Sequence, residues 1–211
     1  MDNGMRDTET TVWTIGHSTH TYERLLALLR SVDITAVADV RTSPYSRHFP
    51  QFSRDILKDE LRTDGLAYSF LGKELGGRPK GSQYYCDGVA DYERMAKAPD
   101  FQHGVQRVLE GAQKFRIALM CSEHDPLDCH RCLLVGRALA ERGVTVKHIQ
   151  SNGSVVSHRE IEEQILKLEG QRGDDLFISG DERLAAAYRK RARKVAYAEP
   201  SRGSSDTVAA E

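Results

Sequence analysis

Residues 116–132 read Arg-Ile-Ala-Leu-Met-Cys-Ser-Glu-His-Asp-Pro-Leu-Asp-Cys-His-Arg-Cys, and this stretch decides the fold. Its apolar first part predicts a buried strand, and residues 133–140 resume apolar positions at helical spacing. Between them lies a dense run of thiol, carboxylate, imidazole and guanidinium groups. In open α/β folds ligands bind where the carboxyl end of a parallel strand faces a helix N-terminus. The stretch therefore predicts where a functional site lies.

The chain before this stretch predicts a βαβ unit. Residues 11–18 form a β-branched and aromatic run that ends at Gly-His, and leucines at helical spacing follow. Residues 34–41 then form a second buried run that ends in charge. A strand, a helix and a strand within about thirty residues predict parallel strands joined by a right-handed crossover. We therefore expect His17 and Arg41 at the same edge of the sheet.

The remaining segments complete a single domain. Residues 67–71 and 143–149 predict two more strands, and helices are expected after Ser53, over 91–95 and 100–113, and after Ser157. The predicted fold class is α/β, a three-layer Rossmann-like domain with a mainly parallel sheet of about five strands. Its predicted parts are a flexible N-terminus over 1–10, the domain over 11–170, a helical extension over 171–198 and a disordered tail over 199–211.

The composition places no strong charge on the molecule as a whole. A net charge of -1 over 211 residues gives no global attraction to nucleic acid or to a membrane, so any electrostatic site must be local. No apolar run approaches the roughly 20 residues that span a bilayer, and the first residues are too polar for a signal peptide. We therefore expect a cytoplasmic protein with no membrane partner. The basic run over 189–194 is expected to be a solvated helix face.

Basic residues follow several predicted strands. Guanidinium forks suit the bidentate recognition of phosphate or carboxylate, and flanking aromatic residues can stack on a base. We therefore expect a phosphate-bearing partner, either a small molecule such as a nucleotide or a nucleic acid. The expected ligand-binding residues are Arg41, Tyr45, Arg47, Arg78, His130 and Arg131. For each single arginine, a surface or ion-pair role is the competing interpretation.

Three residues are candidates for chemistry: Glu123, Cys121 and His17. A carboxylate held beside apolar residues can act as acid, base or nucleophile toward a glycosidic carbon. A thiol at a strand terminus that faces amides and basic groups can have a lowered pKa and attack an electrophile. The competing interpretations are a salt bridge for Glu123 and a small core residue for Cys121. These residues predict an enzyme of hydrolase or glycosyl-transfer type.

A non-catalytic module that senses a ligand, a metal or the redox state is the alternative. Three of the four cysteines crowd into one segment, unlike the disulfide framework of a secreted domain. The soft ligands Cys121, His124, Cys129, His130 and Cys132 would suffice for zinc, and Cys129 and Cys132 have a dithiol spacing. Zinc sites normally draw ligand pairs from separated segments, and no second pair is evident. We therefore assign no metal and no cofactor.

Four groups of residues match a known family pattern in order and spacing. They are Thr14-Ile15-Gly16-His17-Ser18, Asp39-Val40-Arg41 with Pro44 and Ser46-Arg47, Leu75-Gly76-Gly77-Arg78-Pro79, and Met120-Cys121-Ser122-Glu123 with Cys129-His130-Arg131. On these motifs the chain resembles, from about residue 12 to 150, a bacterial and archaeal family catalogued as domain of unknown function 488. The resemblance implies a compact α/β domain and makes the named residues the expected site. Cys132 lies outside the pattern, which weakens the idea of a Cys129/Cys132 pair.

Overall fold

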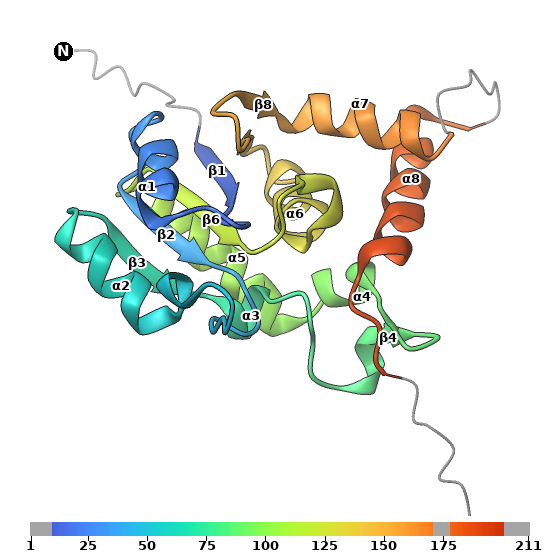
Figure 1. The fold of residues 1–211 in the computed structure, drawn as a ribbon. Coiled ribbons are helices and arrows are strands. Elements are labelled where there is room, and N and C mark those ends of the chain that lie inside the picture. Colours follow the sequence, from blue (N-terminus) through green and yellow to red (C-terminus); the bar gives the residue numbers. More distant parts are fainter. Residues whose placement is uncertain (1–9, 171–177, 201–211) are drawn as a thin grey trace, which may run out of the picture.

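The computed structural model describes residues 10–170 and 178–200, which form a six-stranded sheet with helices on both faces (Figure 1). The strands are β1 (Thr11–Gly16), β2 (Ala36–Asp39), β3 (Ala67–Phe70), β6 (Ile117–Cys121), β7 (Thr145–Ile149) and β8 (Val155–Ser157). They lie in the order β3-β2-β6-β1-β7-β8. The first five are parallel, as predicted. The short β8, which pairs antiparallel with β7, was not predicted because three residues show no periodicity.

Alternating side chains divide the sheet between two cores. Trp13, Ile15 and Met120 face one side, where α1 (Tyr22–Arg30) and α2 (Arg54–Thr63) cover them. Their neighbours, such as Val12 and Leu119, face the other side, which is covered by the remaining long helices. These are α5 (Pro99–Ala112), α7 (His158–Leu168) and α8 (Gly180–Val195). Burial on both faces explains why the parallel strands read as continuous apolar runs.

Shorter elements complete the chain. They are α3 (Gly72–Leu75), α4 (Tyr92–Ala96), α6 (Arg137–Ala140), the hairpin β4 (Tyr85–Cys86) and β5 (Val89–Ala90), and the tight turns η1 (Pro50–Phe52), η2 (Ser82–Tyr84) and η3 (Pro126–Asp128). The glycine-rich run that follows β3 begins with the one-turn α3. The helix predicted after Cys132 begins earlier, as the π-helical turn η4 (Arg131–Gly136) that leads into α6.

The position of β6 brings the predicted site together. β6 lies between β1 and β2, and the pairing continues past the strand ends. The His17 amide donates to the Cys121 carbonyl at 2.8 Å, and the Ser18 amide donates to the Ser122 carbonyl at 3.0 Å. On the other side, the Val40 amide donates to the Met120 carbonyl at 3.0 Å. The loops that leave these three strands are therefore held at one edge of the sheet.

The helix α8 packs on the domain through Ala187, Tyr188 and Ala192, and its basic residues form ion pairs around this contact. The expected basic face is exposed to solvent, since Arg189, Lys190, Arg193 and Lys194 each keep more than half of the side chain accessible. It is also paired with carboxylates of the protein, because α8 lies beside α4, α7 and η3. The pairs are Arg189 with Glu93, Lys190 and Lys194 with Glu169, Arg191 with Asp128, and Arg193 with Asp87. Tyr188 on the same helix is buried in the core.

The expectations for the two ends of the chain lie almost wholly outside the described residues. Thr10 directly precedes β1, and the Glu199 amide donates to the Gly88 carbonyl at 2.8 Å. Residues 171–177, the first part of the predicted helical extension, also lie outside the described residues. Among the helices that the structure describes, none combines the length and the apolar character needed to cross a bilayer.

Candidate functional site

A cleft of about 590 Å³ opens at the carboxyl edge of β1, β2 and β6. Its walls come from the loops after these strands, from the Gly77-Arg78 segment and from the residues that follow α8. Seven of the nine predicted site residues line it: His17, Arg41, Tyr45, Arg78, Cys121, Glu123 and His130. The other two, Arg47 and Arg131, do not lie on its wall. The C-terminal edge of the sheet is therefore where most of the predicted residues meet.

Four side chains converge at the floor of the cleft. The Glu123 Oε2 atom accepts hydrogen bonds from the Sγ atoms of Cys121 and Cys129, at 2.7 and 2.9 Å. The Nδ1 atom of His130 lies 3.8 and 3.9 Å from the same two sulfur atoms. Its Nε2 atom lies 2.9 Å from the Val40 carbonyl, which can only accept. Neutral His130 therefore carries its proton on Nε2 and directs the lone pair of Nδ1 toward the sulfurs.

The environment separates the proton affinities of these groups. Burial, followed by the hydrogen bond with Cys129, raises the pKa of Cys121 well above its ordinary value. Burial alone would raise the pKa of Cys129, but the hydrogen bond from Cys121 and the charge of Arg131 outweigh it and lower this pKa. Burial opposes ionisation of Glu123, yet the two thiol hydrogen bonds lower its pKa to about 2. Glu123 is thus an ionised carboxylate that is exposed to the cleft.

A buried ion pair builds one wall of the cleft. The Arg41 guanidinium donates from Nε and from one terminal nitrogen to the two oxygens of Asp39, at 2.9 and 2.6 Å. It also donates to the Phe52 carbonyl at 2.9 Å. Asp39 is fully buried and Arg41 nearly so. Most of the Arg41 donors, and its charge, are therefore already engaged by the protein.

His17 extends this wall. Its Nδ1 atom lies 3.0 Å from the Ser18 carbonyl, which places the proton on Nδ1, and its Nε2 atom accepts from Arg41 at 3.1 Å. Burial, together with the charge of Arg41, lowers the pKa of His17 to about 4. The imidazole is therefore neutral near pH 7, and both its nitrogens are engaged.

Arg131 and Arg78 have different surroundings. Arg131 is buried, and its guanidinium donates to the carbonyls of Glu123 and His124 at 2.7 and 3.0 Å, so it fixes the loop that carries Glu123. Arg78 is exposed at the cleft, and its guanidinium lies 4.9 Å from the ring centre of Tyr197. Arg47 is exposed but off the cleft wall. Arg78 is thus the predicted arginine that faces the cleft without a carboxylate partner among the described residues.

Two glycines of the motifs allow close approach at the floor. A Cβ atom on Gly16 would lie 1.9 Å from the Glu123 carbonyl oxygen, and one on Gly77 would lie 2.8 Å from the His130 ring. Neither glycine has a positive φ, so these positions require glycine only because a larger side chain would not fit.

Sequence reasoning missed several residues around the cleft. Tyr197 reaches its rim from beyond α8, a position that no local pattern signals, and Tyr92 reaches it from α4. Cys129 was considered as one of five soft metal ligands and as the dithiol partner of Cys132, but the structure separates these two cysteines. Cys129 joins Cys121 and Glu123, whereas the Cys132 sulfur lies 3.9 Å from Nε2 of His148.

His148 belongs to a second buried polar chain. Nδ1 of His148 lies 2.8 Å from the Thr14 hydroxyl, and its Nε2 atom lies 3.0 Å from Nδ1 of His158. Nε2 of His158 lies 3.0 Å from the Tyr188 hydroxyl, which donates to Glu162 at 3.2 Å. Because Glu162 can only accept, the direction of each hydrogen bond follows. Thr14 donates to His148, His148 to His158, His158 to Tyr188, and Tyr188 to Glu162. The chain is satisfied internally and lies away from the cleft.

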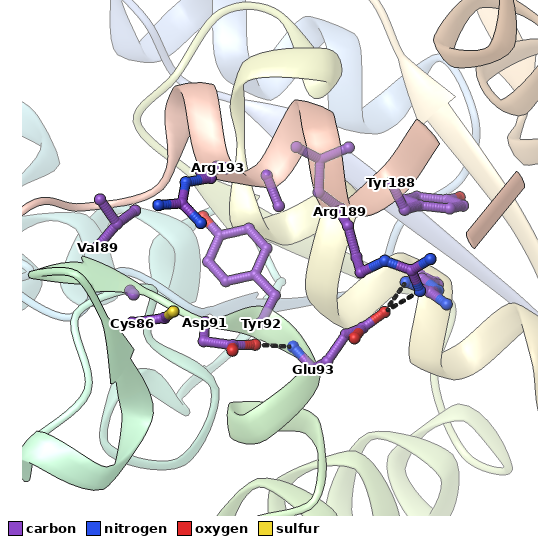
Figure 2. Close-up of a pocket in the computed structure, with 12 residues that line it drawn as sticks. Cys86, Val89, Asp91, Tyr92, Glu93, Tyr188, Arg189 and Arg193 are labelled. Carbon is purple, nitrogen blue, oxygen red and sulfur yellow. Dashed lines mark hydrogen bonds and ion pairs between the residues drawn. The ribbon is translucent and has the colours of Figure 1, made fainter. Parts of the chain in front are cut away.

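A smaller cavity of about 140 Å³ lies between the β4–β5 hairpin, α4 and α8 (Figure 2). Figure 2 shows Glu93 paired with Arg189 on its wall. The nearby Arg193 is paired with Asp87. Because these charges are already matched, we attribute this cavity to the packing of α8 on the domain.

A known protein family matches the chain. The sequence model of a family described as "Domain of unknown function DUF488" matches residues 21–138, which is more than half of the chain. The matched range includes Arg41, Arg78, Cys121, Glu123 and His130 of the cleft. Neither a curated protein nor a solved structure matches the chain.

Proposed function

The chain belongs to the family described as Domain of unknown function DUF488, and we propose that it is an enzyme that acts on a phosphate-bearing ligand of the nucleotide type. The observation that carries this proposal is the cleft. Its floor presents the ionised Glu123, while its rim presents a guanidinium, hydroxyl groups and an exposed aromatic ring.

The rim suits phosphate oxygens. Arg78 offers an exposed guanidinium, and hydroxyl groups supply further donors along the loops. The hydroxyl residues on the wall are Ser18, Thr19, Thr42, Ser43, Ser46 and Ser122. Charge-assisted hydrogen bonds from guanidinium to phosphate are among the stronger polar interactions in proteins. Arg41 contributes mainly by holding the wall, since its donors are bound to Asp39 and Phe52.

The same rim suits a base. Tyr45 lines the cleft with 63% of its surface exposed, which is unusual for a large aromatic side chain. Phe49 lies on the wall close by in the sequence. Exposed aromatic rings beside phosphate-binding groups stack on nucleobases, and each such contact contributes about 1–3 kcal/mol.

The floor supplies the chemistry. An ionised carboxylate in a cleft can attack a glycosidic carbon or stabilise the positive charge that develops there, which fits a reaction of hydrolase or glycosyl-transfer type. Glu123 is therefore the proposed catalytic group, with the Cys121 thiol as its immediate neighbour. His17 is assigned a positioning role, because its lone pair is bound to Arg41.

Thermal unfolding in the presence of ligands tests the proposal. Adenosine 5′-monophosphate is expected to stabilise the protein, by about 2.7 kcal/mol at a concentration of about 100 Kd. Arg78→Ala is expected to weaken stabilisation by the nucleotide and by inorganic phosphate, and Tyr45→Ala by the nucleotide alone. Arg62→Ala, which removes an exposed arginine on α2, is the matched control and should behave like the wild type.

Two outcomes would count against the proposal. One is the absence of stabilisation by a panel of nucleotides that covers the common bases. The other is equal stabilisation of the Arg78→Ala variant and the wild type. For catalysis, Glu123→Gln is expected to keep nucleotide binding while release of the free base, followed by chromatography, falls at least about 100-fold.

A further inference from the structure

We propose that Cys121, Cys129, His130 and Glu123 form a zinc site at the floor of the cleft, with Glu123 as the exchangeable ligand. One donor atom from each residue lies within 4.8 Å of all the others. Two thiolates, an imidazole and a carboxylate are the donor types that zinc takes in proteins. The inference goes beyond the nucleotide proposal and does not depend on it. As the exchangeable ligand, Glu123 would leave the ion before its carboxylate acts on a substrate.

The geometry of the buried donors suits a tetrahedral ion. Zinc bonds of about 2.3 Å to sulfur and about 2.0 Å to nitrogen place neighbouring ligand atoms roughly 3.5 Å apart. Nδ1 of His130 lies 3.8 and 3.9 Å from the sulfurs of Cys121 and Cys129. The Glu123 oxygen is closer to both sulfurs, at 2.7 and 2.9 Å. Because Glu123 is the exposed member, a small outward movement of its side chain makes room for the ion.

The surroundings orient the ligands as a metal site requires. The Val40 carbonyl accepts from Nε2 of His130, which fixes the ring and leaves Nδ1 as a ligand. Metal-binding histidines almost always have such a partner on the other nitrogen. The backbone of Gly77 packs against the same ring, and the Arg131 amide donates to the Cys129 sulfur at 3.4 Å.

The charge balance supports the same assignment. Arg131 is 1% exposed and has no carboxylate partner among the residues that the structure describes. Its Nε atom is buried without a hydrogen-bond partner. Two thiolates and one carboxylate carry three negative charges, which a zinc dication and this guanidinium would neutralise. A buried cation is costly unless charges around it compensate it.

The exposure of the four ligands indicates the kind of zinc site. Cys121, Cys129 and His130 are buried, whereas Glu123 opens on the cleft. Sites with three fixed protein ligands and an exchangeable fourth position are typical of zinc that meets a substrate or a water, and structural sites are closed. The proposed zinc would therefore present its exchangeable position to the contents of the cleft.

The neighbouring cluster of Cys132, His148 and His158 is the competing metal site. Its histidine nitrogens are already joined in the hydrogen-bonded chain that runs from Thr14 to Glu162. Binding a metal there would break this chain and leave buried polar groups without partners. The floor of the cleft is therefore the better site, and a variant in each cluster distinguishes the two.

Elemental analysis of the untagged full chain, purified without chelators or nucleotides, tests the proposal. We expect about one zinc per chain in the wild type, since one donor set binds one ion. Cys129→Ser should lose most of it. Cys86→Ser, which alters a cysteine that does not line the cleft, and His158→Gln should retain it. Cobalt substitution should give the visible absorption bands of a tetrahedral site and a thiolate charge-transfer band. Both should be lost in Cys129→Ser. In Glu123→Gln the visible bands should be shifted.

The proposal is overturned by a folded wild-type chain that neither contains nor takes up zinc or cobalt. It is equally overturned if His158→Gln, rather than Cys129→Ser, loses the metal, or if intact mass shows a Cys121–Cys129 disulfide in place of a metal. Circular dichroism of each variant establishes that it is folded. The metal measurement uses no nucleotide, so the two proposals can fail independently. Absence of zinc with nucleotide stabilisation intact would contradict only the zinc site. Bound zinc without nucleotide stabilisation would contradict only the nucleotide proposal.

Discussion

At the scale of single residues, the wall of the cleft depends on Asp39. This carboxylate is fully buried at the end of β2, and it accepts from the amide, Nε and a terminal nitrogen of Arg41. The hydroxyl of Tyr68 also donates to it, at 2.7 Å. Removing one partner of a buried ion pair leaves the other charge uncompensated, which costs about 3–5 kcal/mol.

We therefore expect Asp39→Asn to lower the free energy of unfolding by about 3 kcal/mol, measured by urea denaturation near pH 7. Tyr68→Phe removes one hydrogen bond and leaves the ion pair, so it should cost only about 1–2 kcal/mol. Equal costs for the two variants would show that the ion pair does not hold the wall.

At the scale of elements, two helix starts that look alike in the sequence are built differently. Ser157 at the start of α7 forms a capping box, in which Glu160 accepts from its amide at 2.7 Å and the Glu160 amide donates back to its hydroxyl at 3.2 Å. Ser53 at the start of α2 makes no such side-chain hydrogen bond to the helix. The sequence contains the reason, because a glutamate lies three residues after Ser157 and an isoleucine lies three residues after Ser53.

Ser157→Ala is accordingly expected to destabilise the protein by about 1 kcal/mol in chemical denaturation. Ser53→Ala should change the free energy of unfolding by less than half of this amount. The interpretation of the capping box fails if the two substitutions have the same effect, or if Ser53→Ala is the more harmful one.

At the scale of the whole molecule, the polar chain from Thr14 to Glu162 joins β1, β7, α7 and α8 through the core. Burial, followed by the charge of Arg137, lowers the pKa of His158 to about 4. Burial, together with the neighbouring His158, lowers that of His148 well below its ordinary value. His158 also faces Tyr188 from α8 and Glu162 from its own helix. Folding therefore requires both imidazoles to be neutral.

The sign of the pH dependence follows from this requirement. Between about pH 6.5 and about pH 4 the unfolded chain binds a proton that folded His158 does not, so stability should fall as the pH falls, by about 3 kcal/mol from this residue. Urea denaturation near pH 7 and near pH 5 should measure about 2 kcal/mol of this loss, because pH 5 lies about 1.5 pH units below the unfolded pKa of about 6.5. His158→Gln should reduce it, although His17 and His148 act in the same direction and keep part of it. An unchanged pH dependence in this variant would contradict the assignment.

Much of the fold and the place of the site could be predicted from the sequence. Five parallel strands and the edge where the site lies follow from apolar runs that end in charge, because strand direction and the two-residue period fix which groups meet at the carboxyl edge. The insertion of β6 between β1 and β2 was not predictable, since strand order depends on packing between distant segments. The antiparallel β8 was too short to show a pattern.

The amino-acid sequence by itself determined which reactive groups the molecule has and at which end of the sheet they lie. Only the tertiary structure decided their partners: Arg41 is bound to Asp39, Arg131 to two carbonyls, and Arg78 is open to the cleft. It also separated Cys129, which is extended before the helix, from Cys132 inside the first turn. The physical reason is that hydrogen bonds and ion pairs act over a few ångströms, and such distances between residues far apart along the chain exist only once the chain is folded.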